Sequence, residues 1–159
     1  MDIKEGIVSF VFSSKSKMAG LILIALFLSI TFSVTAQSSL PEGWRLPTEW
    51  EWQAVADFDG SWEWGCGTVI HNGMANYKGS AHPDGTTIRG TFGSYGYGMC
   101  NMAGNVEEWT SSEYAGSVRI IRDGYWGMLA YYCRVAHRPH NAPSLCSYGI
   151  GFRPVIDLP

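Results

Sequence analysis

Apolar residues in this chain keep a helical spacing over one short stretch. Trp52, Val55 and Ala56 lie three and four residues apart, and side chains with this spacing share one face of a helix. We therefore expect a helix over about 48–58 with this face buried. Because large rings are mostly buried in folded proteins, Trp50 is also expected in the core.

The residues before this face are typical of a helix start. Thr48 and Glu51 are three residues apart. They form a capping box, in which each side chain accepts a hydrogen bond from the other residue's backbone amide. Pro47 disfavours a helical conformation in the residue before it, so the helix is expected to begin at Thr48.

Elsewhere the hydrophobic pattern is short or absent. The run 118–122 contains branched apolar residues and predicts a strand. Residues 59–97 are rich in Gly and have no period, which indicates loops with short extended pieces. Residues 123–157 mix aromatic, Gly, Pro and polar residues, and this mixture predicts long loops that return to a final strand around 152–156.

The stretch 98–112 has neither a helical nor a strand period. Side-chain oxygens of Asn101, Asn105 and Glu108, with carbonyl groups near Gly104, are the ligands that a hard cation such as calcium prefers. The residues therefore indicate a candidate metal site.

A second interpretation of the same stretch needs no metal. Its Asn and Gly residues would form turns, while Met102 and Trp109 face the core. Glu107 and Glu108 would then lie in solvent. Composition alone leaves both interpretations open.

The N-terminal residues 1–36 have the pattern of an export signal. Lys15 and Lys17 precede the apolar run 21–28, and the small residues at 34–36 suit cleavage after this segment. The run is short for a membrane span, although an uncleaved anchor helix is the alternative. We expect a secreted, periplasmic or cell-surface bacterial protein with no stable membrane span after signal cleavage.

Composition and charge narrow the classes of partner and fold. A net charge of -3 and a pI near 5.7 give no basic surface for nucleic acid. The chain has 19 Gly and 14% aromatic residues but only 16% charged residues, which favours short strands and turn-rich loops over a helical bundle. Four Cys allow three complete disulfide pairings, and the sequence does not select one.

Three segments together resemble the formylglycine-generating, or sulfatase-modifying-factor, family. They are 43–52, the stretch 98–112, and the segment 133–153 that ends in Gly-Phe-Arg. The resemblance implies an α+β, C-type-lectin-like domain with short strands, one or two helices and long irregular loops. This domain would cover 43–159 after a linker at 37–42, and it would be shortened at its N-terminus.

The resemblance also implies calcium as a cofactor, at two sets of positions. The first set supplies two side chains and two carbonyl groups, and its residues are Asn76, Tyr77, Asp84 and Thr86. The second set does the same, with Asn101, Gly104, Val106 and Glu108. Asx turns at both places are the alternative.

Family members that make formylglycine bind copper through two cysteines just after a Gly-Gly-Ser motif. This chain has Asp-Gly-Tyr at 123–125 and Met128 at the first cysteine position. The second position falls within 130–132, and Cys133 aligns a few residues past it. A single thioether does not replace two thiolates as ligands of Cu(I), so we expect neither bound copper nor formylglycine synthesis.

We favour a ligand-binding protein over an enzyme, because aromatic residues crowd the C-terminal segment. Rigid amphipathic rings bury a large area at low entropic cost. The family also contains variable binding proteins that retroelements diversify in this segment. The expected ligand is a protein or a glycan, and the expected contacts are Tyr125, Trp126, Met128, Tyr131, His137, His140 and Tyr148. The alternatives are an oxidoreductase of the formylglycine-generating type, rings that fill the core, and a structural role in a secreted complex.

Overall fold

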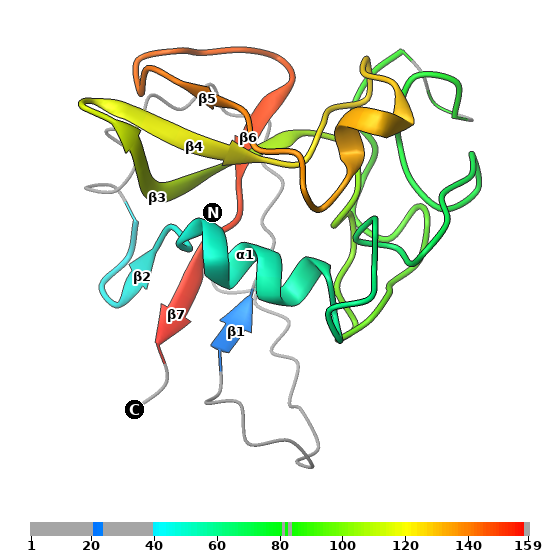
Figure 1. Cartoon of the computed structure of the whole chain (residues 1–159), viewed down its shortest axis with the longest axis horizontal. Helices are drawn as coiled ribbons and strands as arrows, with labels where there is room; N and C mark the ends of the chain where they lie inside the picture. Colours follow the sequence, from blue (N-terminus) through cyan, green and yellow to red (C-terminus); the bar gives the residue numbers. More distant parts are fainter. Residues whose placement is uncertain (1–20, 24–39, 81, 83, 158–159) are drawn as a thin grey trace, which may run out of the picture.

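The computed structural model describes residues 21–23, 40–80, 82 and 84–157. Figure 1 shows two small sheets and one α-helix joined by long loops. The helical elements are α1 (Glu49–Ala56) and the 3₁₀-helix η3 (Ala130–Cys133). The strands are β1 (Leu21–Leu23), β2 (Trp44–Arg45), β3 (Glu107–Ala115), β4 (Val118–Arg122), β5 (His140–Asn141), β6 (Ile150–Phe152) and β7 (Val155–Asp157).

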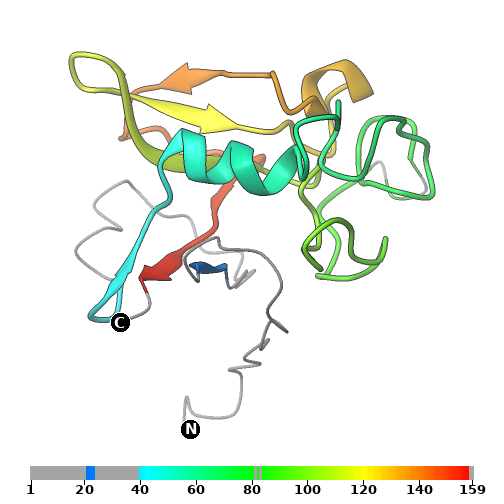
Figure 2. The same ribbon diagram turned by 60° about the horizontal axis from the view of Figure 1, so that its bottom comes forward.

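The larger sheet has the strand order β5-β4-β3-β6, and the smaller one has the order β1-β7-β2. All neighbouring strands are antiparallel except β3 and β6, which are parallel. Helix α1 packs against β3 and β4, as Figure 2 shows from a second direction. The sequence predicts one final strand at 152–156. Instead, Arg153 and Pro154 separate two short strands that belong to different sheets.

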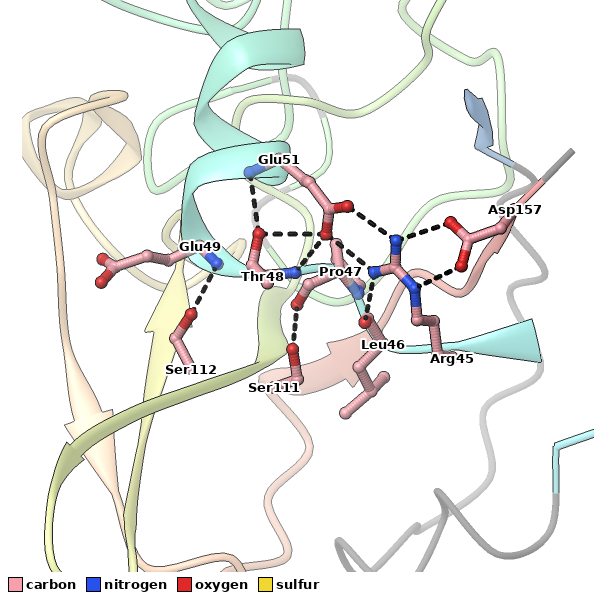
Figure 3. Close-up of polar contacts among 9 residues, drawn as sticks. All are labelled: Arg45, Leu46, Pro47, Thr48, Glu49, Glu51, Ser111, Ser112 and Asp157. Carbon is pink, nitrogen blue, oxygen red and sulfur yellow. Dashed lines mark hydrogen bonds and ion pairs between the residues drawn. The ribbon is translucent and has the colours of Figure 1, made fainter. Parts of the chain in front are cut away.

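The predicted helix is confirmed, including its capping box. The Thr48 hydroxyl accepts from the Glu51 amide at 3.2 Å, and the Glu51 carboxylate accepts from the Thr48 amide at 2.7 Å. Arg45 makes a bidentate contact with the same carboxylate and another with the carboxylate of Asp157 (Figure 3). These contacts hold the start of α1 next to β2 and β7. The hydrogen bond from Arg45, and then the one from the Thr48 amide, lower the pKa of Glu51 to about 2.

The apolar face of α1 is buried as the spacing predicts. Trp52 and Ala56 are fully buried and pack with Met102 and Val135. The expectation for Trp50 is wrong, because its side chain is 64% exposed. Two residues along a helix turn by about 200°, so Trp50 faces solvent when Trp52 faces the core.

Strand β3 lies inside the larger sheet, between β4 and β6, and the sequence pattern does not predict it. The ten residues 101–110 are all buried, so the interpretation that places Glu107 and Glu108 in solvent is wrong. The expected burial of Met102 and Trp109 is confirmed. Trp109 packs with Leu46 and Ile121 in a core cluster of its own.

The region 59–97 forms loops, as expected, and its described part contains only turns and isolated bridges. These loops pack around a cluster of buried small side chains: Cys66, Ala75, Ala103 and Cys133. Three buried polar residues near this cluster have left-handed backbone: Asn101, Asn105 and Asp123, with φ of 54°, 74° and 69°. Asn and Asp tolerate this conformation better than other residues with a side chain.

The predicted signal segment 1–36 lies outside the described residues except for Leu21–Leu23, which form β1 and pair with β7. Within the described part of the chain, no helix has the length and apolar character required to cross a membrane.

Candidate functional site

A buried ion pair holds the framework of the candidate site. The Glu108 carboxylate on β3 accepts hydrogen bonds from Arg153 at 2.7 and 2.9 Å and from the Trp52 indole at 2.7 Å. Arg153 also donates to the carbonyl oxygens of Cys100 and Asn101. This network ties β3, α1 and the end of β6 together, so the loops between these elements start from fixed points.

A second buried group fixes the other side of α1. Arg122, at the end of β4, donates to Glu49, to Gln53 at 2.9 Å and to the carbonyl oxygen of Val135 at 2.6 Å. Glu49 is also paired with Arg138, and this hydrogen bond, together with the charges of both arginines, lowers its pKa. The chain therefore enters and leaves the segment 123–137 at rigid positions.

Three rings gather on the loops that follow β4 and precede β6. Tyr125, Trp126 and Tyr148, which we call the aromatic trio, have ring centroids 5.7–5.9 Å apart. Tyr125 stands nearly perpendicular to the other two, at 82° and 84°, so the rings meet as a corner. Tyr148 is 73% exposed. The trio brings together three of the seven residues that the sequence predicts as ligand contacts.

Two glycines leave room for the Tyr125 ring, which packs closely against their backbone. A Cβ on Gly127 would lie 2.5 Å from this ring, and one on Gly149 would lie 2.7 Å from it. The ring therefore occupies space that only glycine leaves free. A ring held in this way loses little entropy when a ligand binds.

The backbone of Glu107 lies next to the trio. Its amide donates to the Gly149 carbonyl oxygen at 2.8 Å, and a Cβ on Gly149 would lie 2.7 Å from the Tyr125 ring. The residue is only 8% exposed, and burial raises the pKa of its carboxyl group to about 7. The pKa of Tyr125 is also raised, first by a hydrogen bond with Tyr148 and least by the negative charge of Glu107.

A second aromatic group surrounds η3. Tyr131 is 60% exposed and makes an edge contact with Tyr132, which in turn contacts His137. The Arg134 guanidinium lies 4.6 Å from the Tyr131 ring centroid. Burial, and then the charge of Arg122, lower the pKa of His137.

The remaining two predicted contacts lie apart from both groups. His140 stacks on Tyr114 with centroids 3.7 Å apart and planes 9° from parallel, at the edge of the larger sheet. Met128 is half-buried, and its carbonyl oxygen accepts from the Lys78 amide at 2.7 Å. The seven predicted residues therefore do not form one continuous site.

The loop around residue 85 lies against Asn76, the first residue of the first predicted calcium set. The Asn76 side-chain nitrogen donates to the Gly85 carbonyl oxygen at 2.8 Å, while its oxygen accepts from the Ser80 hydroxyl at 3.1 Å. Asn76 is buried, whereas Asp84 is exposed. One carboxylate, one amide oxygen and nearby carbonyl groups are donors that fit calcium, provided that the Asn76 amide is rotated by half a turn.

The second predicted set has a different charge balance. The Glu108 carboxylate already accepts from Arg153 and Trp52, so a cation there would share it with a guanidinium. Asn101, however, has a buried side-chain nitrogen without a hydrogen-bond partner. If the amide were rotated by half a turn, its oxygen would take that place, which is the orientation that a cation requires.

The copper position of the family has no thiolate in this structure. The nearest cysteine, Cys133, is fully buried, and burial raises the pKa of its thiol. A protonated thiol is a poor metal ligand. Across the described residues, no three His, Cys, Asp or Glu side chains gather closely enough to hold a metal ion.

Sequence reasoning missed two residues of potential functional importance, Glu107 and Tyr114. Both lie on β3, and the missed strand explains the omission. Once β3 is known, side chains alternate between its faces, so Glu107 and the paired Glu108 must point in opposite directions.

The fold and its framework define the class of protein. A family model of the sulfatase-modifying factor enzyme 1-like domain matches residues 13–158, and the chain therefore belongs to this family. Its α+β architecture of short strands and long loops is the C-type-lectin-like fold of formylglycine-generating-enzyme-like domains.

Three comparisons place the chain within this class. It is 32% identical over 131 residues to serine/threonine-protein kinase pkn1 of Chlamydia pneumoniae, a match that covers 70% of this chain and 20% of that protein. It is 30% identical over 132 residues to inactive C-alpha-formylglycine-generating enzyme 2 of Bos taurus, covering 70% of this chain and 43% of that one. Treponema denticola variable protein 1 superposes with a TM-score of 0.64 at 26% identity, over 72% of this chain and 48% of the other. The chain thus spans less than half the length of each.

Proposed function

We propose that this chain is a non-catalytic, ligand-binding member of its family and that the aromatic trio holds the ligand. The observation that carries the proposal is the corner formed by Tyr125, Trp126 and Tyr148 beside fixed strands. Rings buried throughout would leave nothing for a ligand, but Tyr148 is 73% and Tyr131 is 60% exposed. A protein or a glycan is the expected partner, since exposed rings suit both.

The copper position supports a non-catalytic role. Met128 stands at the first cysteine position, and Cys133 is buried as a protonated thiol. The bovine relative is itself named as inactive, and the Treponema denticola protein is named as a variable protein. By analogy, we propose that the loops of this chain are the variable part and that the ion pairs of Glu108 and Arg122 are the constant part.

Binding is tested on arrays of defined glycans and of surface-protein peptides, with wild type and two trio variants, Tyr125→Ala and Trp126→Ala. We expect a ligand that both variants bind at least tenfold more weakly. Trp50→Ala is the matched control, because it removes an exposed ring on α1 outside the trio. Equal binding by the trio variants, or no binding on either array, would overturn the proposal.

Two further observations would distinguish a diversified binding protein from an oxidoreductase. A near-copy of the codons for residues 122–153 beside a reverse-transcriptase gene would support a diversified binding protein. Copper-dependent oxygen consumption, with conversion of a Cys-x-Pro-x-Arg peptide to its aldehyde, would instead establish an oxidoreductase.

We also propose that calcium binds at the first set, where Asp84 supplies the charge and Asn76 the amide oxygen. At the second set, the proposal requires calcium to share Glu108 with Arg153. Saturating calcium is expected to raise the melting temperature of chelator-treated protein, and Asp84→Asn is expected to abolish that rise. No heat of binding in calorimetry would exclude calcium.

Export remains part of the proposal, and it conflicts with one feature of the fold. Cleavage after residue 36 would remove β1, which pairs with β7, and the family match already begins at residue 13. The intact mass of protein recovered from the culture medium or periplasm decides between cleavage after residue 36 and retention of β1. A chain that begins at Gln37 supports the signal, whereas retention of Leu21–Leu23 in a cytoplasmic product contradicts it.

A further inference from the structure

Glu107 is a buried carboxyl group that the framework does not use. Among the described residues it has no ion-pair partner, and its side chain makes no hydrogen bond, although the residue is only 8% exposed. Its neighbour Glu108, by contrast, accepts three hydrogen bonds. A buried carboxylate without a partner is costly, so its presence under a surface aromatic group calls for a function.

The backbone directs Glu107 toward the trio. Glu108 points to Arg153 and α1, and alternation along β3 sends Glu107 to the opposite face. The Glu107 amide donates to the Gly149 carbonyl oxygen, and a Cβ on Gly149 would lie 2.7 Å from the Tyr125 ring, so the backbone of residue 107 lies close to this ring.

We infer that the aromatic trio and Glu107 together form a binding site for an organic ammonium ion, such as a quaternary ammonium or methylated lysine group. This inference rests on the proposed function and names the chemistry of its ligand. Aromatic faces attract cations that lie within about 6 Å of the ring centroid. The trio offers two walls at right angles, and Glu107 supplies the negative charge behind one of them.

The carboxyl group selects this ligand class over a neutral one. A sugar or an apolar peptide side chain would stack on the rings without any need for a buried charge. An ammonium ion gains from both elements, because its apolar surface contacts the rings while the carboxylate behind them attracts its charge. Arg153, Arg122 and Arg119 are paired with Glu108, Glu49 and Glu113, so none of them supplies the positive charge beside Glu107.

The test uses choline and its neutral isostere 3,3-dimethylbutan-1-ol as probes, titrated into the full chain by NMR at pH 8. We expect choline to shift the Trp126 and tyrosine ring signals with an affinity at least tenfold above that of the isostere. Glu107→Gln should reduce choline affinity at least tenfold. Trp126→Leu should also weaken choline binding, whereas Trp50→Leu should not.

Equal affinity for the two probes, unchanged binding by Glu107→Gln, or no choline binding would overturn the ammonium site. The proposed function would survive that result if trio variants still lost an array ligand. Glu107→Gln removes a buried charge and keeps the side-chain shape, so we do not expect it to prevent folding.

A second inference concerns two cysteines and rests on backbone pairing. Trp64 and Arg134 form an antiparallel bridge, and the Val135 amide donates to the Glu63 carbonyl oxygen at 2.9 Å. Trp64 also pairs with Gly67, so Cys66 lies in the turn between them, beside the segment that carries Cys133. Both side chains are buried in the same cluster, next to Ala75 and Ala103.

We propose that Cys66 and Cys133 form a disulfide in an oxidising compartment, which selects one pairing that the sequence leaves open. Both cysteines lie within two residues of the Trp64–Arg134 pair, and paired Cα atoms of antiparallel segments are about 4.5–5.5 Å apart, within the range that a disulfide spans. With glutathione disulfide as the oxidant, one thiolate displaces a glutathione thiolate, and the second protein sulfur displaces the other glutathione. The two protein thiols thus lose two electrons and two protons, and two glutathione thiols form.

Burial sets the timing of this reaction. In the folded chain burial raises the pKa of the Cys66 thiol to about 12, so few thiolates are present to react. The bond should therefore form during folding. Refolding in a glutathione redox buffer should yield a peptide cross-link of residues 66 and 133 in mass spectrometry, and reductant should then lower the melting temperature.

Cys66→Ser should lose both the link and the effect of reductant, whereas Cys146→Ser, at an exposed cysteine, should keep both. Four free thiols after oxidative refolding, or a link that involves Cys100 or Cys146, would overturn this pairing.

Discussion

The carboxylate of Glu108 and the guanidinium of Arg153 lie face to face in the interior, joined by hydrogen bonds of 2.7 and 2.9 Å. Both side chains are at most 2% exposed. The pair connects the central strand β3 to the short link between β6 and β7. Since β6 and β7 belong to different sheets, one buried ion pair fixes the point at which the two sheets meet.

Arg153→Ala should destabilise the fold by about 3–5 kcal/mol, because it leaves the buried Glu108 charge uncompensated. Urea denaturation measures the loss. In a double-mutant cycle with Glu108→Gln, we expect a coupling energy of at least about 1 kcal/mol. Additive effects would mean that the two residues act independently.

Gly104→Ala should destabilise the protein more than a substitution at another left-handed glycine. A Cβ at Gly104 would lie 2.2 Å from the Asn76 carbonyl oxygen, whereas one at Gly60 would meet nothing within 4 Å. Both positions have positive φ, 73° and 85°. The difference in free energy of unfolding between the two variants isolates the collision, and we expect at least about 2 kcal/mol. Similar losses would contradict the close packing of residue 76 on residue 104.

Glu107→Gln should stabilise the free protein at neutral and alkaline pH. The folded-state pKa of about 7 lies above the ordinary 4.5, so the folded chain binds the proton more tightly than the unfolded chain. The contribution of Glu107 to stability should therefore be most favourable below pH 4.5, fall between about 4.5 and 7, and stay low above 7. The gain from the substitution is at most about 3 kcal/mol above pH 7 and vanishes near pH 4. Thermal unfolding at pH 4, 6 and 8 gives the comparison, and a gain that does not change with pH would refute the account.

Thr48→Ala should cost about 1 kcal/mol, because the Glu51 amide loses its capping acceptor. Thr68→Ala, at an exposed loop position, is the control and should change stability by less than about 0.5 kcal/mol. Chemical denaturation measures both. Equal effects would mean that the cap contributes nothing to stability.

The sequence predicted the elements whose signals are local. The capping box and the spacing of Trp52 and Ala56 located α1, and a branched apolar run located β4. Strand β3 was not predicted because its first residues are charged, and their burial depends on partners far along the chain. Glu108 meets Arg153 45 residues away, and no local pattern encodes that contact.

The candidate site was predicted only in part for the same reason. Tyr125 and Trp126 are adjacent in sequence, but their contact with Tyr148 depends on Gly127 and Gly149 leaving room for a ring. The composition indicates an aromatic-rich segment but does not divide its residues into spatial groups. The prediction from sequence therefore grouped His140 with the trio, although the His140 side chain stacks on Tyr114 at the edge of the larger sheet.

The succession of β6, two residues and β7 has a consequence for biosynthesis. Of the described strands, β6 and β7 are synthesised after all the others, and they supply the parallel partner of β3 and the middle strand of the smaller sheet. A nascent chain that stops before residue 150 lacks both partners and the guanidinium that neutralises Glu108. Folding of residues 44–141 must therefore wait for residues 150–157, and a product that lacks them should remain open to proteolysis.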